Sequence, residues 1–259
     1  MKNIGAFFAK EMRIYFQAPT AYVVMALVLL LAGLFFYDLL SSYAAALTYY
    51  QYMAQNPGAL EQFNVNDGIV TPLFQNISVL LLLTVPLITM RIFAEEKKTG
   101  TDELILTSPV SIPEVVLGKF LAALAFYGIL LVLTLHFGAI LIKIGNPDLG
   151  KLAASYLGLL LLGATFLAVG VFASALTSNQ IVAAMVSFSV LLLFWIVGWL
   201  AESASAPFLK KALEYASIID HFEAFGRGVI KLPDVLFYVS VIAFFLFLTV
   251  RAVESSRWR

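Results

Sequence analysis

Long stretches without a single charged residue are the feature that most constrains the fold of this chain. About 20 helical residues, at a rise of about 1.5 Å each, cross a hydrocarbon core of roughly 30 Å. Stretches of this length therefore predict membrane-spanning helices. The charge-free stretches cover residues 14–37, 68–90, 120–142, 152–201 and 235–250.

Two of these stretches need interpretation before the spans can be counted. The stretch 152–201 is too long for one helix, and the polar cluster Thr177-Ser178-Asn179-Gln180 divides it with good N-capping residues. The last stretch is short, but Asp234 and Arg251 can lie at the two membrane interfaces. The sequence thus predicts six transmembrane helices over approximately residues 20–40, 77–92, 115–141, 152–176, 180–200 and 235–252.

Composition excludes several classes of protein. Hydrophobic residues make up 61% of the chain and charged residues 12%, whereas soluble domains carry roughly 25% charge. Sixteen Lys and Arg balance sixteen Asp and Glu, so no net basic field attracts nucleic acid. The absence of cysteine excludes disulfides and thiolate metal sites, and two histidines cannot alone build a metal centre. We expect an all-α integral membrane protein without a metal and without a nucleic-acid partner.

The positions of Lys and Arg predict the orientation. With the N-terminus inside, ten of them fall in cytoplasmic segments and six in outer loops, and residues 41–76 contain none. This bias favours cytoplasmic termini. The charge-free run 14–37 exceeds the roughly 7–15 apolar residues of a signal peptide, so we expect an uncleaved first span.

The N-terminal residues 3–17 form an amphipathic pattern. Large apolar side chains share one face of the expected helix, and polar side chains occupy the other. We expect this helix to lie in the cytoplasmic interface and to end near Pro19. Glu11 interrupts the apolar face: it either reaches Lys10 or a lipid headgroup, or it pairs with a cytoplasmic partner or loop.

The cytoplasmic loop 93–114 is predicted to contain a short helix. Thr99 or Thr101 can provide its N-cap, two acidic residues follow in its first turn, and Pro109 ends it. A short helix with an exposed apolar edge at the membrane surface is typical of a docking element, and a solvated connector is the alternative. The spacing Ser111-Ile-Pro-Glu114 then matches a capping box and predicts the start of the third span.

Two outer segments differ in character. The segment 41–76, rich in Tyr, Ala, Gln and Asn, is expected to be a cover over a pore mouth or a loose loop. The segment 202–234 is too apolar for a free loop and predicts short helices that rest in the outer interface or dip into it. Within it, His221 lies close in sequence to Asp220, Glu223 and Arg227. No nucleophile accompanies them, so a surface ion-pair network is favoured over a catalytic cluster.

Ionisable residues within the spans would indicate ion coupling. We expect His136 to be the only such residue at membrane depth, which favours a conduit whose work is done by another subunit. An ion-coupled carrier or channel remains an alternative, and a lipid-modifying enzyme is a weaker one.

Gly145–Lys151 matches a phosphate-binding loop formally, but Leu152 replaces the required Ser or Thr, so no nucleotide site is expected. Small residues in the fourth span suit close helix packing. Candidates for the pathway are Thr84, Pro86 and His136.

The order of these parts resembles the membrane-spanning permease subunit of type-2 ABC transporters over essentially the whole chain. The segments that carry the resemblance are Lys10-Glu11-Met-Arg-Ile-Tyr-Phe16 with Pro19, Arg91 through Glu96, Thr99-Gly-Thr101, Glu103-Leu104, Ser108-Pro-Val-Ser111, Gly118-Lys119, and Asp220-His-Phe-Glu-Ala-Phe-Gly-Arg-Gly228. The last of these segments is most similar to permeases of gliding motility and of copper-enzyme maturation.

The resemblance implies a single permease domain over residues 1–259 in the bacterial inner membrane. Two permease subunits, identical or related, would enclose a pathway, and two ATP-binding subunits would supply ATP, magnesium and hydrolysis, so this chain itself would be noncatalytic and free of cofactors. Export is the expected direction.

The resemblance also implies roles for named residues. The helix around Thr99–Thr107 would be the coupling helix, and residues 3–17 would form the gate helix. The implied ATPase-coupling residues are Arg91, Glu95, Glu96, Thr99, Gly100, Thr101, Glu103, Leu104 and Pro109; the gate-helix residues are Lys10, Glu11, Arg13, Tyr15 and Phe16; and the outer-segment residues are His221, Phe222, Phe225 and Arg227.

Overall fold

The computed structural model describes residues 2–53, 64–102, 110–203 and 206–256. Throughout these ranges the regular structure is helical, and six helices are long and apolar enough to cross a membrane. The predicted all-α membrane fold with six spans is therefore confirmed. The spanning helices are α2 (Pro19–Met53), α3 (Thr71–Thr89), α6 (Ile112–Ile144), α7 (Leu149–Leu176), α8 (Gln180–Ser203) and α11 (Leu232–Ser256).

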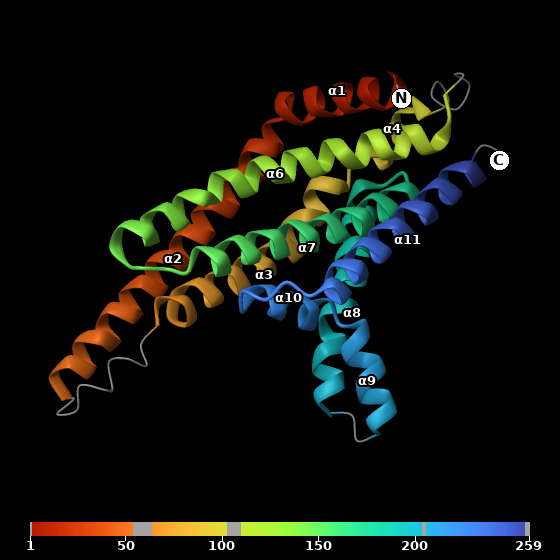
Figure 1. The fold of residues 1–259 in the computed structure, drawn as a ribbon. Helices are drawn as coiled ribbons and strands as arrows, with labels where there is room; N and C mark the ends of the chain where they lie inside the picture. The colour runs from red at the N-terminus through yellow and green to blue at the C-terminus, as the bar shows by residue number, and fades with distance from the viewer. Residues whose placement is uncertain (1, 54–63, 103–109, 204–205, 257–259) are drawn as a thin grey trace.

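Shorter helices occupy the two ends of the bundle (Figure 1). The start of α1, the helix α4 and the end of α11 gather at one end, which we call the α4 end. The helix α9 lies at the other end, which we call the α9 end, and the turn between α6 and α7 lies away from α4. The bounds of the short elements are α1 (Lys2–Gln17), the π-helix η2 (Asn66–Val70), α4 (Ala94–Thr99), α9 (Pro207–Ala216) and α10 (Ile218–Gly226).

The first spanning helix is longer than the sequence suggested. Residues 41–53, expected to be part of a cover or loose loop, continue α2 without a break to Met53. This segment contains the strong helix former Ala44-Ala45-Ala46 and neither Pro nor Gly, which explains the continuation. The 35 residues of α2 give the helix a length of about 52 Å, which is well beyond a hydrocarbon core of roughly 30 Å. The end of α2 accordingly projects from the bundle (Figure 1).

Helix α7 lies at the centre of the bundle and contacts α3, α6, α8, α10 and α11. Its small residues allow the neighbours to approach: a Cβ added at Gly170 would lie 2.1 Å from the Thr89 hydroxyl oxygen of α3, and one at Gly163 would lie 2.3 Å from the Tyr127 ring of α6. The predicted close packing of the fourth span is confirmed, because Ala164, Ala168, Gly170 and Ser174 are all buried.

Candidate functional site

Helix α1 packs directly on α6 at the α4 end, and a glycine makes this contact possible. A Cβ added at Gly118 of α6 would lie 2.7 Å from the Phe7 Cβ and 3.0 Å from the Ile4 carbonyl oxygen. Real Cβ atoms do not approach this closely, so only glycine fits here without displacing α1. Part of the apolar face that the sequence assigned to the lipid interface therefore contacts α6.

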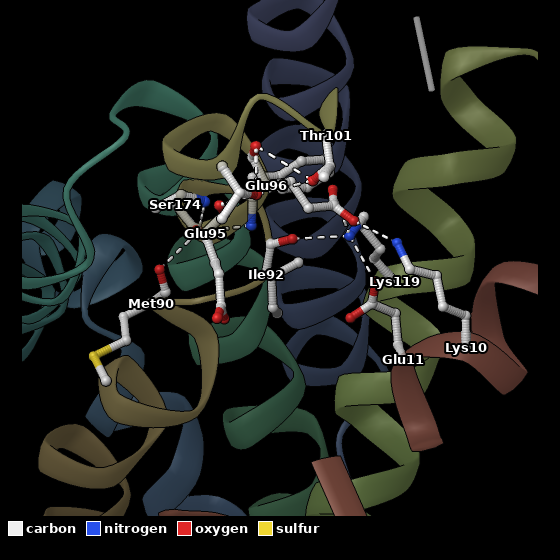
Figure 2. Close-up of polar contacts among 12 residues, drawn as sticks. Lys10, Glu11, Met90, Ile92, Glu95, Glu96, Thr101, Lys119 and Ser174 are labelled. Carbon is white, nitrogen blue, oxygen red and sulfur yellow. Dashed lines mark hydrogen bonds and ion pairs between the residues drawn. The ribbon is translucent and has the colours of Figure 1, made fainter. Parts of the chain in front are cut away.

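A buried ammonium group holds α1, α4 and α6 together beside this contact (Figure 2). The Lys119 Nζ of α6 lies 2.6 Å from the Glu11 Oε1 of α1 and 2.9 Å from the Glu96 Oε2 of α4. It also donates a hydrogen bond of 2.8 Å to the Ile92 carbonyl. The contacts with Glu11 and Ile92 are hydrogen bonds, and the contact with Glu96 is an ion pair. The Lys119 side chain is 0% exposed, and the Glu11 side chain is 7% exposed.

Lys10 extends this arrangement to the surface. Its Nζ donates a hydrogen bond of 2.6 Å to the Glu96 Oε1, so Glu96 bridges the buried Lys119 and the half-exposed Lys10. Partial burial lowers the pKa of Lys10, but the hydrogen bond and the charge of Glu96 outweigh it and raise the pKa overall. We call Lys10, Glu11, Glu96 and Lys119 the Lys119 network.

The position of Glu11 corrects the sequence interpretation. It is buried and does not reach outward to Lys10 or to a headgroup. The alternative that Glu11 pairs with the cytoplasmic loop is closer to what the structure shows, but the contact is indirect. Glu11 pairs with Lys119 of α6, and Lys119 pairs with Glu96 of α4. The expectation that His136 is the only ionisable residue in the spans is also wrong, because Lys119 lies inside α6.

A serine of the central helix holds the beginning of α4 (Figure 2). The Ser174 Oγ of α7 accepts hydrogen bonds of 3.0 Å from the Phe93 amide and 3.1 Å from the Ala94 amide, and it donates one of 3.1 Å to the Met90 carbonyl. The first amides of a helix have no partner within that helix. Ser174 thus caps α4 from another helix, and Lys97 adds a hydrogen bond to the Ala175 carbonyl near the end of α7.

Replacing Ser174 with alanine is expected to loosen α4 without unfolding the bundle. Loss of a helix N-cap costs about 0.5–2 kcal/mol, and two amides lose their acceptor here. Hydrogen exchange of the Phe93 and Ala94 amides should accelerate about 2- to 30-fold by this estimate. The matched change Ser155→Ala, at another buried serine of α7, should leave these amides unchanged. Equal protection in both variants would contradict the capping role.

Arg91 connects the same corner to α2. Its Nε and Nη2 form a bidentate pair with the Glu95 carboxylate at 2.8 Å and 2.9 Å, and its Nη1 donates a hydrogen bond of 3.2 Å to the Thr20 hydroxyl. Thr20 lies in the first turn of α2. The turn before α4 is therefore attached to α2, while the Lys119 network attaches α4 to α1 and α6.

The loop contains a short helix, α4, that precedes the predicted one. Helix α4 ends at Thr99, whose hydroxyl donates to the Glu95 carbonyl at 2.9 Å. Gly100 follows with φ of +69°, in the left-handed region that favours glycine, and the Thr101 amide donates to the Glu96 carbonyl at 3.0 Å. Thr99 therefore ends α4, and most of the helix predicted to begin at Thr99 or Thr101 lies outside the described residues. The predicted coupling residues Glu103, Leu104 and Pro109 lie outside the described residues.

A cavity of about 390 Å³ is lined by residues of α1, α2, α3, α4 and α6 and of the turn before α4. One wall is polar and belongs to the α4 end, whereas the other wall is apolar and comes from the adjoining helices. Helix α1 thus packs on α6 and also borders this cavity, while Lys10 and Tyr15 contact α4 and α3. The polar lining residues are Lys10, Glu11, Thr20, Arg91, Glu95, Glu96, Thr99 and Thr101, and the others are Ile14, Tyr15, Ala18, Ala21, Val24, Leu87, Ile88, Ile92 and Phe126.

Comparison with known proteins shows the family to which this chain belongs. The family model for ABC-2 family transporter proteins matches residues 6–255, which is nearly the whole chain. The chain belongs to the ABC-2 transporter family. It is a multi-pass membrane subunit, and membership of the family implies an ATP-binding partner subunit. No curated protein matches the permease individually.

The remaining gate-helix residues of the permease divide between the interior and the surface. The Tyr15 hydroxyl donates to the Ile88 carbonyl of α3 at 3.3 Å, and its ring stacks on Phe126 of α6 with 4.8 Å between ring centroids. Arg13 and Phe16 are exposed. Tyr15 therefore contacts two other helices, α3 and α6.

The pathway candidates of the permease do not form one group. Thr84 and Pro86 are buried in α3, where the Thr84 hydroxyl donates to the Leu80 carbonyl of its own helix at 2.8 Å. His136 is exposed on α6, and its Nδ1 lies 2.6 Å from the Leu133 carbonyl of the same helix. Their contribution to a pathway remains a prediction.

The outer segment of the permease differs from the predicted surface network in one respect. Arg227 and Glu223 do form an exposed ion pair at 2.9 Å. His221, however, is buried and pairs with Asp234 of α11 rather than with Asp220, Glu223 or Arg227. Phe222 and Phe225 are buried as well, and a Cβ added at Gly158 of α7 would lie 2.6 Å from the Phe225 Cβ.

No part of the permease that the structure describes offers a group of three or more His, Asp or Glu side chains able to hold a metal ion. Gly118-Lys119 carries part of the resemblance, but the sequence alone did not predict the structural role of Lys119. The available signal was a lysine about two turns inside a span, directly after a glycine. Its partners could not be found from the sequence, because Glu11 and Glu96 lie 108 and 23 positions away.

Proposed function

We propose that this permease and a second membrane subunit, identical or related, enclose a translocation pathway driven by two ATP-binding subunits that dock at the α4 end. ATP and magnesium bind to those partners, and the permease itself holds no cofactor. The proposed location is the bacterial cytoplasmic membrane, with both termini cytoplasmic. Export is the proposed direction, and the branch of gliding-motility and copper-enzyme-maturation permeases remains a suggestion from resemblance.

The Lys119 network is the observation that supports this function most directly. Removing one partner from a buried ion pair costs about 3–5 kcal/mol, whereas an exposed pair contributes about 0–1 kcal/mol. The two buried contacts of Lys119, to Glu11 and to Glu96, therefore outweigh the half-exposed contact of Lys10. A force applied to α4 reaches α6 and α1 together, because separating them would leave charges buried without partners.

The second connection passes force to the centre of the bundle. Ser174 and the Ala175 carbonyl attach α4 to α7, and α7 contacts five other helices. The cavity beside α1 leaves space into which the gate helix can be displaced. A partner that pushes on α4 would thus move helices at membrane depth without entering the membrane itself.

Docking at α4 predicts a loss of the partner when exposed residues in this helix and directly after it are changed. Glu96 is unsuitable for the test because it belongs to the Lys119 network, whereas Lys98 and Thr101 are exposed. Lys98→Glu together with Thr101→Arg should leave the permease inserted and reduce co-purification of its ATP-binding subunit at least about tenfold, equivalent to about 1.4 kcal/mol. The measurement is recovery of the complex from membranes.

The matched control makes the same two changes in charge at the α9 end. Lys211→Glu together with Ser203→Arg alters two exposed residues there and should leave recovery unchanged. Equal loss in both variants, or no loss in either, would refute docking at α4. Uphill solute movement by the purified permease alone in vesicles would instead support the ion-coupled carrier, which family membership does not favour.

A further inference from the structure

The cavity beside α1 is open to two different surroundings. Its polar wall reaches the surface at Lys10 and Thr101, which are exposed. Its apolar wall reaches the surface at Ile14 and Leu87, which are 41% and 42% exposed. A ligand site is lined mainly by apolar groups with a few polar groups that orient the ligand. A molecule that occupies this cavity therefore needs a polar head and an apolar tail.

The apolar opening faces the lipid. Leu87 lies in the last turn of the spanning helix α3, and Leu83, one turn deeper in the same helix, is also exposed. Ile14 lies in the last turn of α1, where that helix approaches the start of α2. The cavity is thus placed at the membrane interface, and a lipid of the adjoining leaflet can enter it from the side.

The charges on the polar wall argue against an anionic headgroup. Two cationic side chains and three carboxylates line the cavity, a net charge of −1. The buried Lys119, which pairs with Glu11 and Glu96, compensates the third carboxylate from behind the wall. No excess of positive charge therefore awaits an anion, whereas a zwitterion meets groups of both signs. The lining cations are Lys10 and Arg91, and the lining carboxylates are Glu11, Glu95 and Glu96.

Both cations keep N–H groups for a ligand. Among the described residues, Lys10 uses one of its three N–H donors, on Glu96, and Arg91 uses three of its five, on Glu95 and Thr20. The two Glu95 oxygens each accept from Arg91, and a carboxylate oxygen can accept a second hydrogen bond. A phosphate can thus accept from the cations while an ammonium donates to a carboxylate.

The aromatic side chains argue against a quaternary ammonium. Choline-type groups are recognised by several aromatic faces that surround them. The two rings that line this cavity, Tyr15 and Phe126, stack on each other with 4.8 Å between centroids, and the Tyr15 hydroxyl donates to Ile88. Carboxylates instead suit a primary ammonium, which has three N–H donors.

We propose that this cavity is a binding site for a zwitterionic phospholipid with a primary ammonium headgroup, namely phosphatidylethanolamine. The ammonium donates to the carboxylates, the phosphate accepts from Lys10 and Arg91, and an acyl chain leaves past Ile14 and Leu87. The volume of about 390 Å³ lies near the lower end of the roughly 300–1,000 Å³ of ligand sites, so it holds the headgroup and the start of a chain. The site does not depend on the proposed function.

The test is a competition between lipids on the purified full chain, followed by native mass spectrometry. The permease is offered equal amounts of phosphatidylethanolamine, phosphatidylcholine and phosphatidylglycerol with identical acyl chains. Phosphatidylethanolamine should bind about tenfold more tightly than either of the others, equivalent to about 1.4 kcal/mol. Equal binding of the three lipids, or a preference for the choline or the anionic lipid, would overturn the proposal.

Glu95→Gln tests the polar wall. Glutamine keeps the shape and an acceptor for Arg91 but removes one negative charge, so the preference for phosphatidylethanolamine over phosphatidylglycerol should fall about tenfold. Glu254→Gln is the matched control, because Glu254 pairs with Arg251 at the same end of the bundle, is similarly exposed, at 36% against 38%, and does not line the cavity. An equal fall in both variants, or no fall in Glu95→Gln, contradicts the site.

Ala18→Phe tests the cavity itself. Ala18 lines the cavity and is half-buried, so a phenylalanine there should fill part of the space and reduce bound phosphatidylethanolamine about tenfold. Ala46→Phe places the same ring at a half-buried alanine near the far end of α2 and should change nothing. Unchanged binding in Ala18→Phe would place the lipid elsewhere; if that variant does not fold, Glu95→Gln still decides the question.

A soluble headgroup separates a membrane lipid from a free amine. Glycerophosphoethanolamine carries the same phosphate and ammonium but no acyl chain, so it should not displace the lipid at equal concentration. This follows because the apolar wall contributes to binding only when a chain is present. Displacement by the soluble compound would show that the site does not recognise a lipid.

Discussion

Lys119→Met should release α1 and α4 from α6 and disconnect ATP hydrolysis from movement of the permease. The substitution leaves Glu11 and Glu96 buried near one another without the ammonium group that both contact. Removing one partner of a buried ion pair costs about 3–5 kcal/mol, which is a large fraction of the roughly 5–15 kcal/mol that stabilises a typical domain. The measurements are the free energy of unfolding of the purified permease and the ATP-driven distance change between labels on α1 and α7.

Two further variants separate the network from general damage to α6. Lys143→Met makes the same change at an exposed position at the other end of the helix, and it should alter stability by no more than about 0.5 kcal/mol. Adding Glu11→Gln to Lys119→Met removes one of the stranded charges and should recover part of the lost stability. Strict additivity of these two changes would show that Glu11 and Lys119 are not coupled, contrary to the structure.

Gly118→Leu should displace α1 from α6. Even a Cβ at this position lies 2.7 Å from the Phe7 Cβ and 3.0 Å from the Ile4 carbonyl oxygen, so a whole leucine side chain cannot fit without moving the helix. Overpacking costs about 1–3 kcal/mol or more. The displacement should also separate Glu11 from Lys119. Labels on α1 and α6 should therefore report a longer distance, and ATP-driven movement should be lost as in Lys119→Met.

The same helix offers a matched control for this substitution. A Cβ added at Gly128 has no atom within 4 Å, so Gly128→Leu should leave the position of α1 unchanged. If both leucine variants displace α1 equally, the effect belongs to α6 as a whole. If neither does, the direct contact at Gly118 is not what positions the gate helix.

Some wrong expectations have a local cause. The segment 41–53 was expected to be part of a loop because it is uncharged and carries polar residues, yet its alanines and the absence of Pro and Gly continue α2. The helix α4 was not predicted, and the Thr99-Gly100 pair ends it. A glycine after two lysines is a C-terminal signal that sequence reasoning could have used.

Other features could not be found from local sequence. Glu11, Glu96 and Lys119 are unremarkable charges until the fold brings three helices to one ammonium group. His221 has three charged neighbours in sequence, but it turns away from them to Asp234. Ser174 was predicted to pack closely, which it does, and its capping of α4 depends on a turn 80 positions away.

The sequence by itself determined the six membrane spans, the helical class and the amphipathic N-terminal helix. These follow from a local constraint: every backbone group in lipid must find its partner within the helix, and the bilayer sets the length. Only the tertiary structure decided which charges are buried together and which helix caps another. Desolvation makes such groups costly unless a partner lies within hydrogen-bonding distance, and that distance is a property of the folded chain.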